Sequence, residues 1–130
     1  MDSDVEVTNN LDQFLHLDFF SGYENYGGHY YPITAIMGDK AGNSIIVDLL
    51  SYYKDANFET SNGLDLETNT ARISRYFSEK FGLQEPYDGS QATQLHDKSI
   101  SYPSYYFCTP EHELENFSIH LFNGSCFLKY

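Results

Sequence analysis

The amino-acid sequence predicts a single α+β domain, in which one or two helices pack on an antiparallel sheet made of an N-terminal hairpin and a C-terminal meander. Three observations predict this class. The chain has 130 residues, which suits one domain with one core. Runs of strand-forming residues alternate with turn-forming stretches, and residues 65–82 have the spacing of an amphipathic helix. Hydrophobic residues make up 41% of the chain, which favours a folded protein over a disordered one.

The N-terminal part is predicted to be a frayed end followed by a helix. Residues 1–9 are polar and acidic, so we expect them to be poorly ordered. The next string, LDQFLHLDFF, places Leu11, Phe14 and Leu15 at helical spacing, and Gly22 provides a stop. The segment SGYENYGGHYY that follows is broken by glycines and is predicted to be an irregular hinge.

A hairpin is predicted after this hinge. The runs YYPITAIM and SIIVDLLSYY are rich in β-branched and aromatic residues, and the turn-forming string GDKAGN separates them. Residues 30–37 are therefore expected to pair with residues 44–50. The polar stretch at residues 54–65 is expected to be a loop.

The strongest helix prediction covers LETNTARISRYFSEKFG, which follows Asp65. Its apolar positions fall on one stripe, and Gly82 suits a left-handed C-terminal cap. Residues 84–101 are turn-rich and polar, which predicts a long surface connection.

The C-terminal part is predicted to be a three-stranded meander. It contains YYFCT and then FSIHLFNGSCFLKY, in which Asn123-Gly124 is a strong hairpin signal. Cys108 and Cys126 both fall in these predicted strands and are interpreted as structural thiols, although neighbouring strands could also bring them into a disulfide.

The charge of the chain is strongly negative and unevenly distributed. The net charge is −12, and residues 1–71 contribute −10 of it, with twelve acids against Lys40 and Lys54. Such a field repels nucleic-acid phosphate and anionic lipid and attracts basic proteins. We therefore expect a basic protein partner and no nucleic acid or membrane. The alternative is that the acidity serves solubility alone.

No motif for catalysis or metal binding is present. The five histidines have no metal-ligand spacing, and HELE at residues 112–115 lacks the second histidine of a zinc protease motif. Nucleophile-elbow, phosphate-loop and dinucleotide patterns do not occur. The chain is therefore predicted not to be an enzyme and to use no cofactor or metal. The N-terminal string has no signal-peptide pattern, and no apolar run is long enough to span a bilayer, so a cytoplasmic location is expected.

Tyrosine and acidic side chains are the candidates for partner binding. The chain has twelve tyrosines and no tryptophan, and tyrosine gives large, rigid contact area at low entropic cost. Side chains in the hinge, the preceding acidic segment and the acidic loop are predicted to contact the partner. They are Asp12, Asp18, Tyr23, Glu24, Tyr26, His29, Asp55, Glu59 and Asp65.

In overall profile the chain resembles the immunity proteins of bacterial polymorphic toxin systems, including those of contact-dependent growth inhibition. The resemblance covers the whole chain and consists of small size, acidity, aromatic loops and the lack of catalytic motifs. It implies that the protein binds one cognate toxin, often a basic nuclease, and covers its active site or substrate surface. No residue role transfers by position.

Three alternative functions remain open from the sequence. A phage-type nucleic-acid mimic would need carboxylates spaced like phosphates. A small enzyme would need a deep pocket that gathers at least two of His29, His112 and Glu113. A regulatory subunit would use an exposed edge strand to pair with another chain. Self-association is compatible with the sequence, but nothing in the sequence indicates it.

Overall fold

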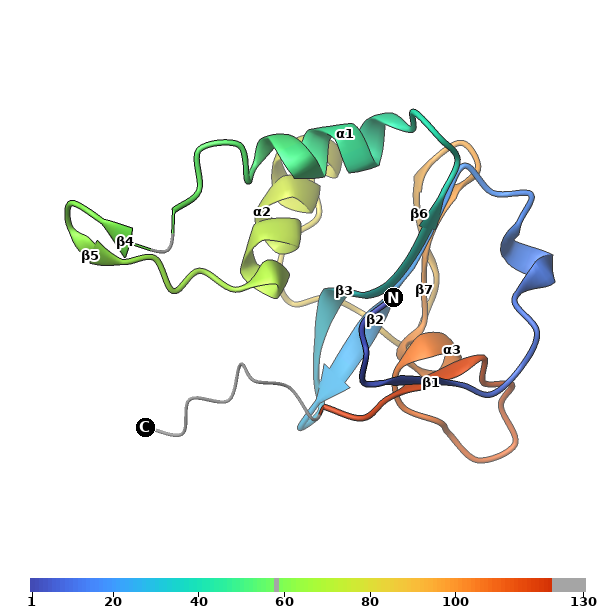
Figure 1. Cartoon of the computed structure of the whole chain (residues 1–130). Coiled ribbons are helices and arrows are strands. Elements are labelled where there is room, and N and C mark those ends of the chain that lie inside the picture. Colours follow the sequence, from blue (N-terminus) through green and yellow to red (C-terminus); the bar gives the residue numbers. More distant parts are fainter. Residues whose placement is uncertain (58, 123–130) are drawn as a thin grey trace.

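The computed structural model describes residues 1–57 and 59–122 and confirms the α+β class (Figure 1). The strands are β1 Val5–Val7, β2 Phe19–Tyr26, β3 His29–Asp39, β4 Glu59–Thr60, β5 Gly63–Leu64, β6 Thr93–His96, β7 Ser99–Tyr102 and β8 Ser118–His120. The helices are the 3₁₀ turn η1 Asp12–Phe14 and α1 Ser44–Ser51, α2 Asn69–Phe81 and α3 Ser104–Phe107. The central sheet has the order β3-β2-β7-β6, and β1-β8 and β4-β5 form separate two-stranded sheets. Within the central sheet β2 and β7 run parallel, while the other neighbours are antiparallel.

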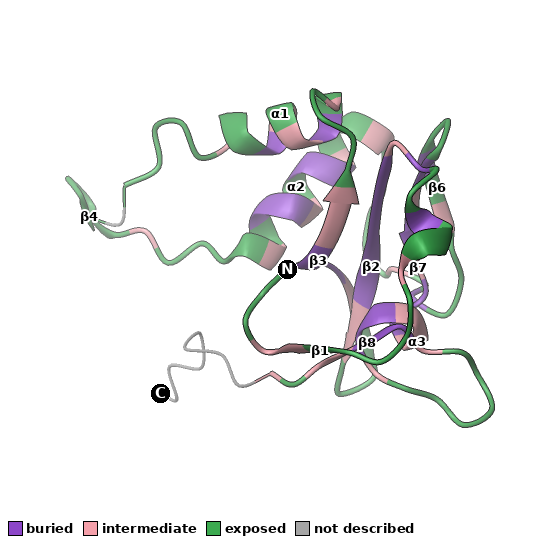
Figure 2. Cartoon of the chain, turned by 45° about the vertical axis from the view of Figure 1, so that its right-hand side comes forward, coloured by how far each residue is buried: buried purple, intermediate pink, exposed green. Residues whose placement is uncertain are grey.

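The central sheet is covered on both faces. Neighbouring residues of a strand point to opposite faces, so Phe19 and Phe20 at the start of β2 enter different clusters. Phe19 packs under α1 and α2, with Ile45, Leu49, Ile73, Tyr76, Phe77 and Leu95. Phe20 packs with Phe14, Leu17, Ile36, Phe107 and Phe117 on the other face. Figure 2 shows the buried residues along β2, in α3 and on the inner sides of α1 and α2.

The predicted N-terminal helix is wrong. Only the single 3₁₀ turn η1 forms there, and β2 begins at Phe19, before the predicted stop at Gly22. The physical reason is that β2 is buried on both faces, so its apolar residues do not alternate with polar ones. A continuous apolar run of this kind cannot be distinguished from a helix by spacing alone.

The predicted hinge is the hairpin between β2 and β3. Tyr26 pairs with His29, and the two residues between them, Gly27 and Gly28, have φ values of 59° and 86°. A two-residue hairpin turn with positive φ at both positions favours glycine. The glycines therefore close a tight turn and do not loosen the segment. β3 is the second strand of this hairpin, and it confirms the strand predicted at residues 30–37.

The prediction that residues 44–50 form the second strand of a hairpin is wrong, because these residues form α1. The Asn43 side chain accepts a hydrogen bond from the Ile45 amide at 2.8 Å and caps the helix. Ile45 and Leu49 then point into the core one turn apart. Capping and packing thus override the strand propensity of the β-branched residues.

The predicted helix before Gly82 is confirmed as α2. Thr68 caps its start by accepting a hydrogen bond from the Ala71 amide at 3.1 Å. Gly82 ends it with φ 71°, and the Leu83 amide donates to the Phe77 carbonyl at 3.3 Å. The apolar stripe faces the sheet through Ile73 and Phe77.

The remaining predictions are corrected in part. Residues 84–101, predicted to be a surface connection, contain β6 and most of β7. The YYFCT strand is instead the short helix α3, which Cys108 follows as a buried residue. Residues 1–9, predicted to be frayed, contain β1, which pairs with β8. The Asn123-Gly124 hairpin and Cys126 lie outside the described residues.

We expect the protein to lose stability above about pH 10 because of buried tyrosines such as Tyr76. Burial, and then the hydrogen bond that its hydroxyl donates to Asp48 at 3.0 Å, raise the pKa of Tyr76 above its ordinary value. A group whose pKa is raised in the folded state stabilises the fold below its unfolded pKa and loses this effect as the pH rises further. Urea denaturation at pH 8 and pH 10.5 should show the fall, and Tyr76→Phe should reduce it.

The control is Tyr105→Phe, which removes a hydroxyl that does not contact Asp48. At pH 8 we expect Tyr76→Phe to cost about 1 kcal/mol, the net value of a typical hydrogen bond. Equal pH dependence in wild type and Tyr76→Phe would contradict the assignment of the alkaline instability to this pair.

Candidate protein-interaction surface

Residues 1–39 and 99–122 come together in the fold, and neither stretch contains a lysine or an arginine. They hold ten of the nineteen acidic residues. β1 pairs with β8, and next to this pair the Thr8 hydroxyl lies 2.6 Å from Oδ1 of Asn116. The side-chain amide of Asn9 donates to the Glu115 carboxylate at 3.4 Å. These contacts place residues 8 and 9, which precede η1, beside Glu115 and Asn116.

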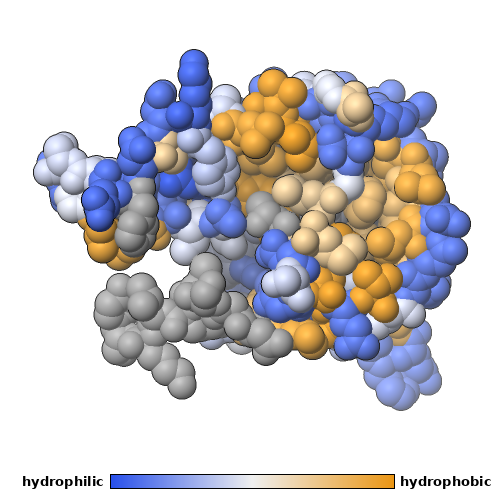
Figure 3. Space-filling model, in the orientation of Figure 1, coloured by the Kyte–Doolittle hydropathy of each residue, from blue (hydrophilic) through white to orange (hydrophobic). Residues whose placement is uncertain are grey.

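This contact produces a surface that we call the acidic face, formed by Glu6, Asp12, Glu111, Glu113 and Glu115. All five residues are exposed. Within the described part of the chain none of these five carboxylates forms an ion pair with a lysine or an arginine. The hydrophilic side chains of the loop project at the lower right in Figure 3. The acidic face therefore keeps its negative charge uncompensated.

Apolar side chains are exposed next to these carboxylates. Val7 follows Glu6 in β1 and is 48% exposed, and Leu114 lies between Glu113 and Glu115 and is 47% exposed. Protein interfaces combine apolar contact area with a polar rim, and isolated exposed apolar residues are also common on ordinary surfaces. The combination with five carboxylates that pair with no lysine or arginine of the described chain makes this face suitable for a basic partner.

The basic residues are found mainly at the helical end and are largely neutralised there. Arg72 is buried and contacts Asp65 at 2.8 Å and Glu67 at 3.3 Å. Arg75 contacts Glu67 at 3.3 Å, Lys80 contacts Asp48 at 3.8 Å, and Lys40 contacts Asp18 at 2.7 Å. The surplus negative charge is consequently concentrated away from α2.

Two predicted partner-binding carboxylates take part in these intramolecular pairs. The hydrogen bond from Lys40 lowers the pKa of Asp18. The Glu67 amide and then Arg72 lower the pKa of Asp65 by hydrogen bonding to its carboxylate. Because each already has a cation beside it, Asp18 and Asp65 add less to an external field than the unpaired carboxylates.

The predicted exposure of Tyr23 is wrong. Its side chain is 1% exposed, and its hydroxyl hydrogen-bonds to Thr93 at 2.6 Å. Tyr23 follows the buried residues Phe19, Phe20 and Ser21 along β2, so it belongs to the core. It cannot contact a partner in the folded protein.

The other predicted residues of the hairpin lie near its tip. Tyr26 is 51% exposed and its ring centroid lies 5.9 Å from that of Phe122, while His29 is exposed. Glu24 is half-buried, and burial raises the pKa of its carboxyl group. The tip can therefore offer Tyr26 and His29 to a partner.

A hollow of about 340 Å³ lies beside this tip. It is lined by Gly28, His29, Tyr30, Tyr31, Glu85, Pro86 and Tyr87. His112 and Glu113 do not line it, because they lie in the loop of the acidic face. The combination of groups that would favour an enzyme is thus not found in this hollow.

The remaining predicted residues, Asp55 and Glu59, lie on a separate arm. The β4-β5 hairpin projects from the body on the side opposite to η1, which carries Asp12 (Figure 1). Figure 2 shows the arm with β4 projecting from the body in a second view. Asp12 and the arm therefore cannot belong to one compact surface.

Sequence reasoning did not include Glu111, Glu113 and Glu115 among the candidates for partner binding. The signal that could have revealed them is the lack of lysine and arginine in residues 99–122, as in residues 1–39. It also missed a group formed by Asp2, Asp4 and His120, because a separation of more than a hundred residues hides such a cluster.

Comparison with protein-family models, with curated proteins and with solved structures found no match. In residues 1–57 and 59–122 no helix has the length and apolar character needed to cross a membrane.

Proposed function

We propose that this chain is an acidic protein-binding module that binds and neutralises a basic bacterial toxin domain, as an immunity protein does. The partner is a nuclease in the first instance, because nucleases use lysine and arginine to hold phosphate. The observation that supports the proposal is the acidic face, with five exposed carboxylates that no lysine or arginine of the described chain neutralises.

The distribution of charge favours this function over solubility alone. A surface that serves only solubility works well with charges of both signs interspersed. Here residues 1–39 and 99–122, which contain no lysine or arginine, come together in the fold, and Arg72 and Arg75 pair with acids elsewhere. A one-signed surface steers an oppositely charged partner and raises its association rate.

The test is co-expression with a toxin domain encoded beside this chain in the genome. We expect the full chain to restore growth and the purified proteins to associate with a rate that falls steeply as salt increases. Failure to restore growth, together with a rate that does not change with salt, would contradict the proposal. A toxin domain without an excess of basic residues serves as the control for specificity.

A further inference from the structure

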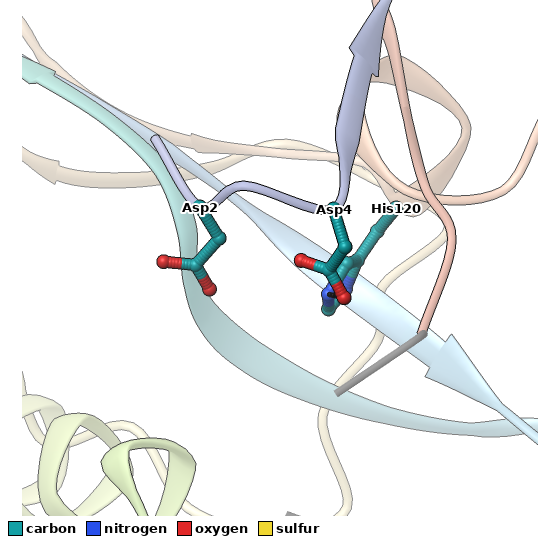
Figure 4. A group of neighbouring side chains, drawn as sticks. All are labelled: Asp2, Asp4 and His120. Atoms are coloured by element: carbon teal, nitrogen blue, oxygen red, sulfur yellow. Dashed lines mark ion pairs between the residues drawn. The ribbon is translucent and has the colours of Figure 1, made fainter. Parts of the chain in front are cut away.

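Asp2, Asp4 and His120 converge at the junction of β1 and β8 (Figure 4). One potential ligand atom from each lies within 4.8 Å of those of the other two. Nε2 of His120 is 3.4 Å from Oδ2 of Asp4, and these side chains are only 14% and 16% exposed. Asp2 is the exposed member of the group.

The backbone at all three positions is fixed by hydrogen bonds. The Asp2 amide donates to the Ala35 carbonyl at 2.8 Å, and the Leu121 amide donates to the Asp4 carbonyl at 2.9 Å. The His120 amide donates to the Cys108 carbonyl at 3.0 Å. The fold thus already holds the backbone of the turn before β1 and of the end of β8 in place, which reduces the entropic cost of binding a ligand.

The imidazole is also oriented from its other side. The ring of His120 lies against that of Phe122, with centroids 4.2 Å apart. Its Nδ1 is buried and has no hydrogen-bond partner among the described residues. No lysine or arginine in the described chain forms an ion pair with Asp2 or Asp4, so two carboxylates face a single imidazole.

From this arrangement we infer a binding site for one divalent transition-metal ion, with zinc as the best fit. An imidazole nitrogen with carboxylate oxygens suits zinc better than magnesium or calcium, which take oxygen ligands alone. Two ligands at about 2.0–2.1 Å from a tetrahedral zinc ion lie about 3.3 Å apart, close to the observed 3.4 Å between Asp4 and His120. Rotation of the exposed Asp2 side chain supplies the third ligand, and water completes the coordination. The site goes beyond the proposed function and does not depend on it.

Zinc titration of the full chain against a chromophoric competing chelator tests this site. We expect one zinc ion per chain, with affinity reduced at least about tenfold by Asp2→Ala and by His120→Gln, since even outer-shell partners of a metal site have effects of this size. Asp97→Ala and His16→Gln are matched controls, because both residues are exposed and lie outside the group. They should leave the affinity unchanged.

A second measurement does not rely on variants. Cobalt(II), added to the isotope-labelled wild type as a paramagnetic substitute for zinc, should shift amide signals of residues 2–5 and 119–121 before any others. Lack of zinc binding by the wild type, equal weakening in all four variants, or cobalt shifts centred on His16, His29, His96 or His112 would each overturn the inference. Loss of zinc binding in Asp2→Ala with native amide spectra would confirm it.

Discussion

Replacing both Glu111 and Glu113 with lysine is expected to slow association with a basic toxin domain at low salt. The expected decrease is about ten- to a thousandfold, the range that electrostatic steering spans. Both side chains are exposed, and neither forms an ion pair with lysine or arginine in the described chain. Reversing them changes the acidic face by four charge units, and the one ion pair removed among the described residues is the exposed contact between Glu113 and His112. Stopped-flow kinetics across a range of salt concentrations should show a slower rate and a weaker dependence on salt.

The matched control is Asp55→Lys together with Glu59→Lys, which makes the same change of charge on the β4-β5 arm. Both residues are exposed there, on the side of the molecule opposite to η1. If this variant slows association as much as the first pair does, the acidic face does not guide the partner. If only the arm variant slows it, the partner binds at the arm. Both variants should unfold within about 0.5 kcal/mol of the wild type, as exposed substitutions usually do.

Phe14→Ala is expected to have the largest effect on stability, about 3–5 kcal/mol. The Phe14 ring is 2% exposed, although only a single 3₁₀ turn carries it. Its centroid lies 4.9 Å from that of Phe117, 5.1 Å from those of Tyr102 and Phe107, and 5.2 Å from that of Phe20. Alanine would leave a cavity among four aromatic rings, in a domain whose total stability is about 5–15 kcal/mol.

Leu15→Ala provides the control at the next position. Leu15 is 71% exposed, so its truncation should change the free energy of unfolding by no more than about 0.5 kcal/mol. Urea denaturation measures both variants. Similar small effects of the two substitutions would show that η1 is not anchored in the core as described.

The sequence predicts well where one local pattern decides the structure. α2 has an apolar stripe, a threonine cap and Gly82 at its end, and all three signals agree. β2 and α1 could not be predicted in this way, because contacts from distant parts of the chain decide them. β2 is covered on both faces, and α1 is a helix because Asn43 caps it while Ile45 and Leu49 reach the core.

The sequence predicts that the candidate surface is acidic, but it does not predict which residues form that surface. The concentration of acids in the N-terminal half indicates Asp12 as a candidate, but three of the five carboxylates of the acidic face come from residues 111–115. Contacts between residues far apart in the sequence join these segments, among them the pairing of β1 with β8 and the hydrogen bond between Thr8 and Asn116. Tyr23 was wrongly included among the contact residues, because the glycines around it suggested a loop although it lies within a strand.

The pairing of β1 with β8 also determines the order of events during synthesis on the ribosome. Val5 pairs with His120, so β1 cannot pair until β8, the last described strand, has been synthesised. Contacts between residues so distant in sequence form slowly, since the intervening chain must close first. A nascent chain that has not yet released residue 120 therefore lacks the complete acidic face. If the proposed function holds, only molecules that include β8 would protect a cell, and premature termination before β8 would abolish protection even though all four strands of the central sheet have been made.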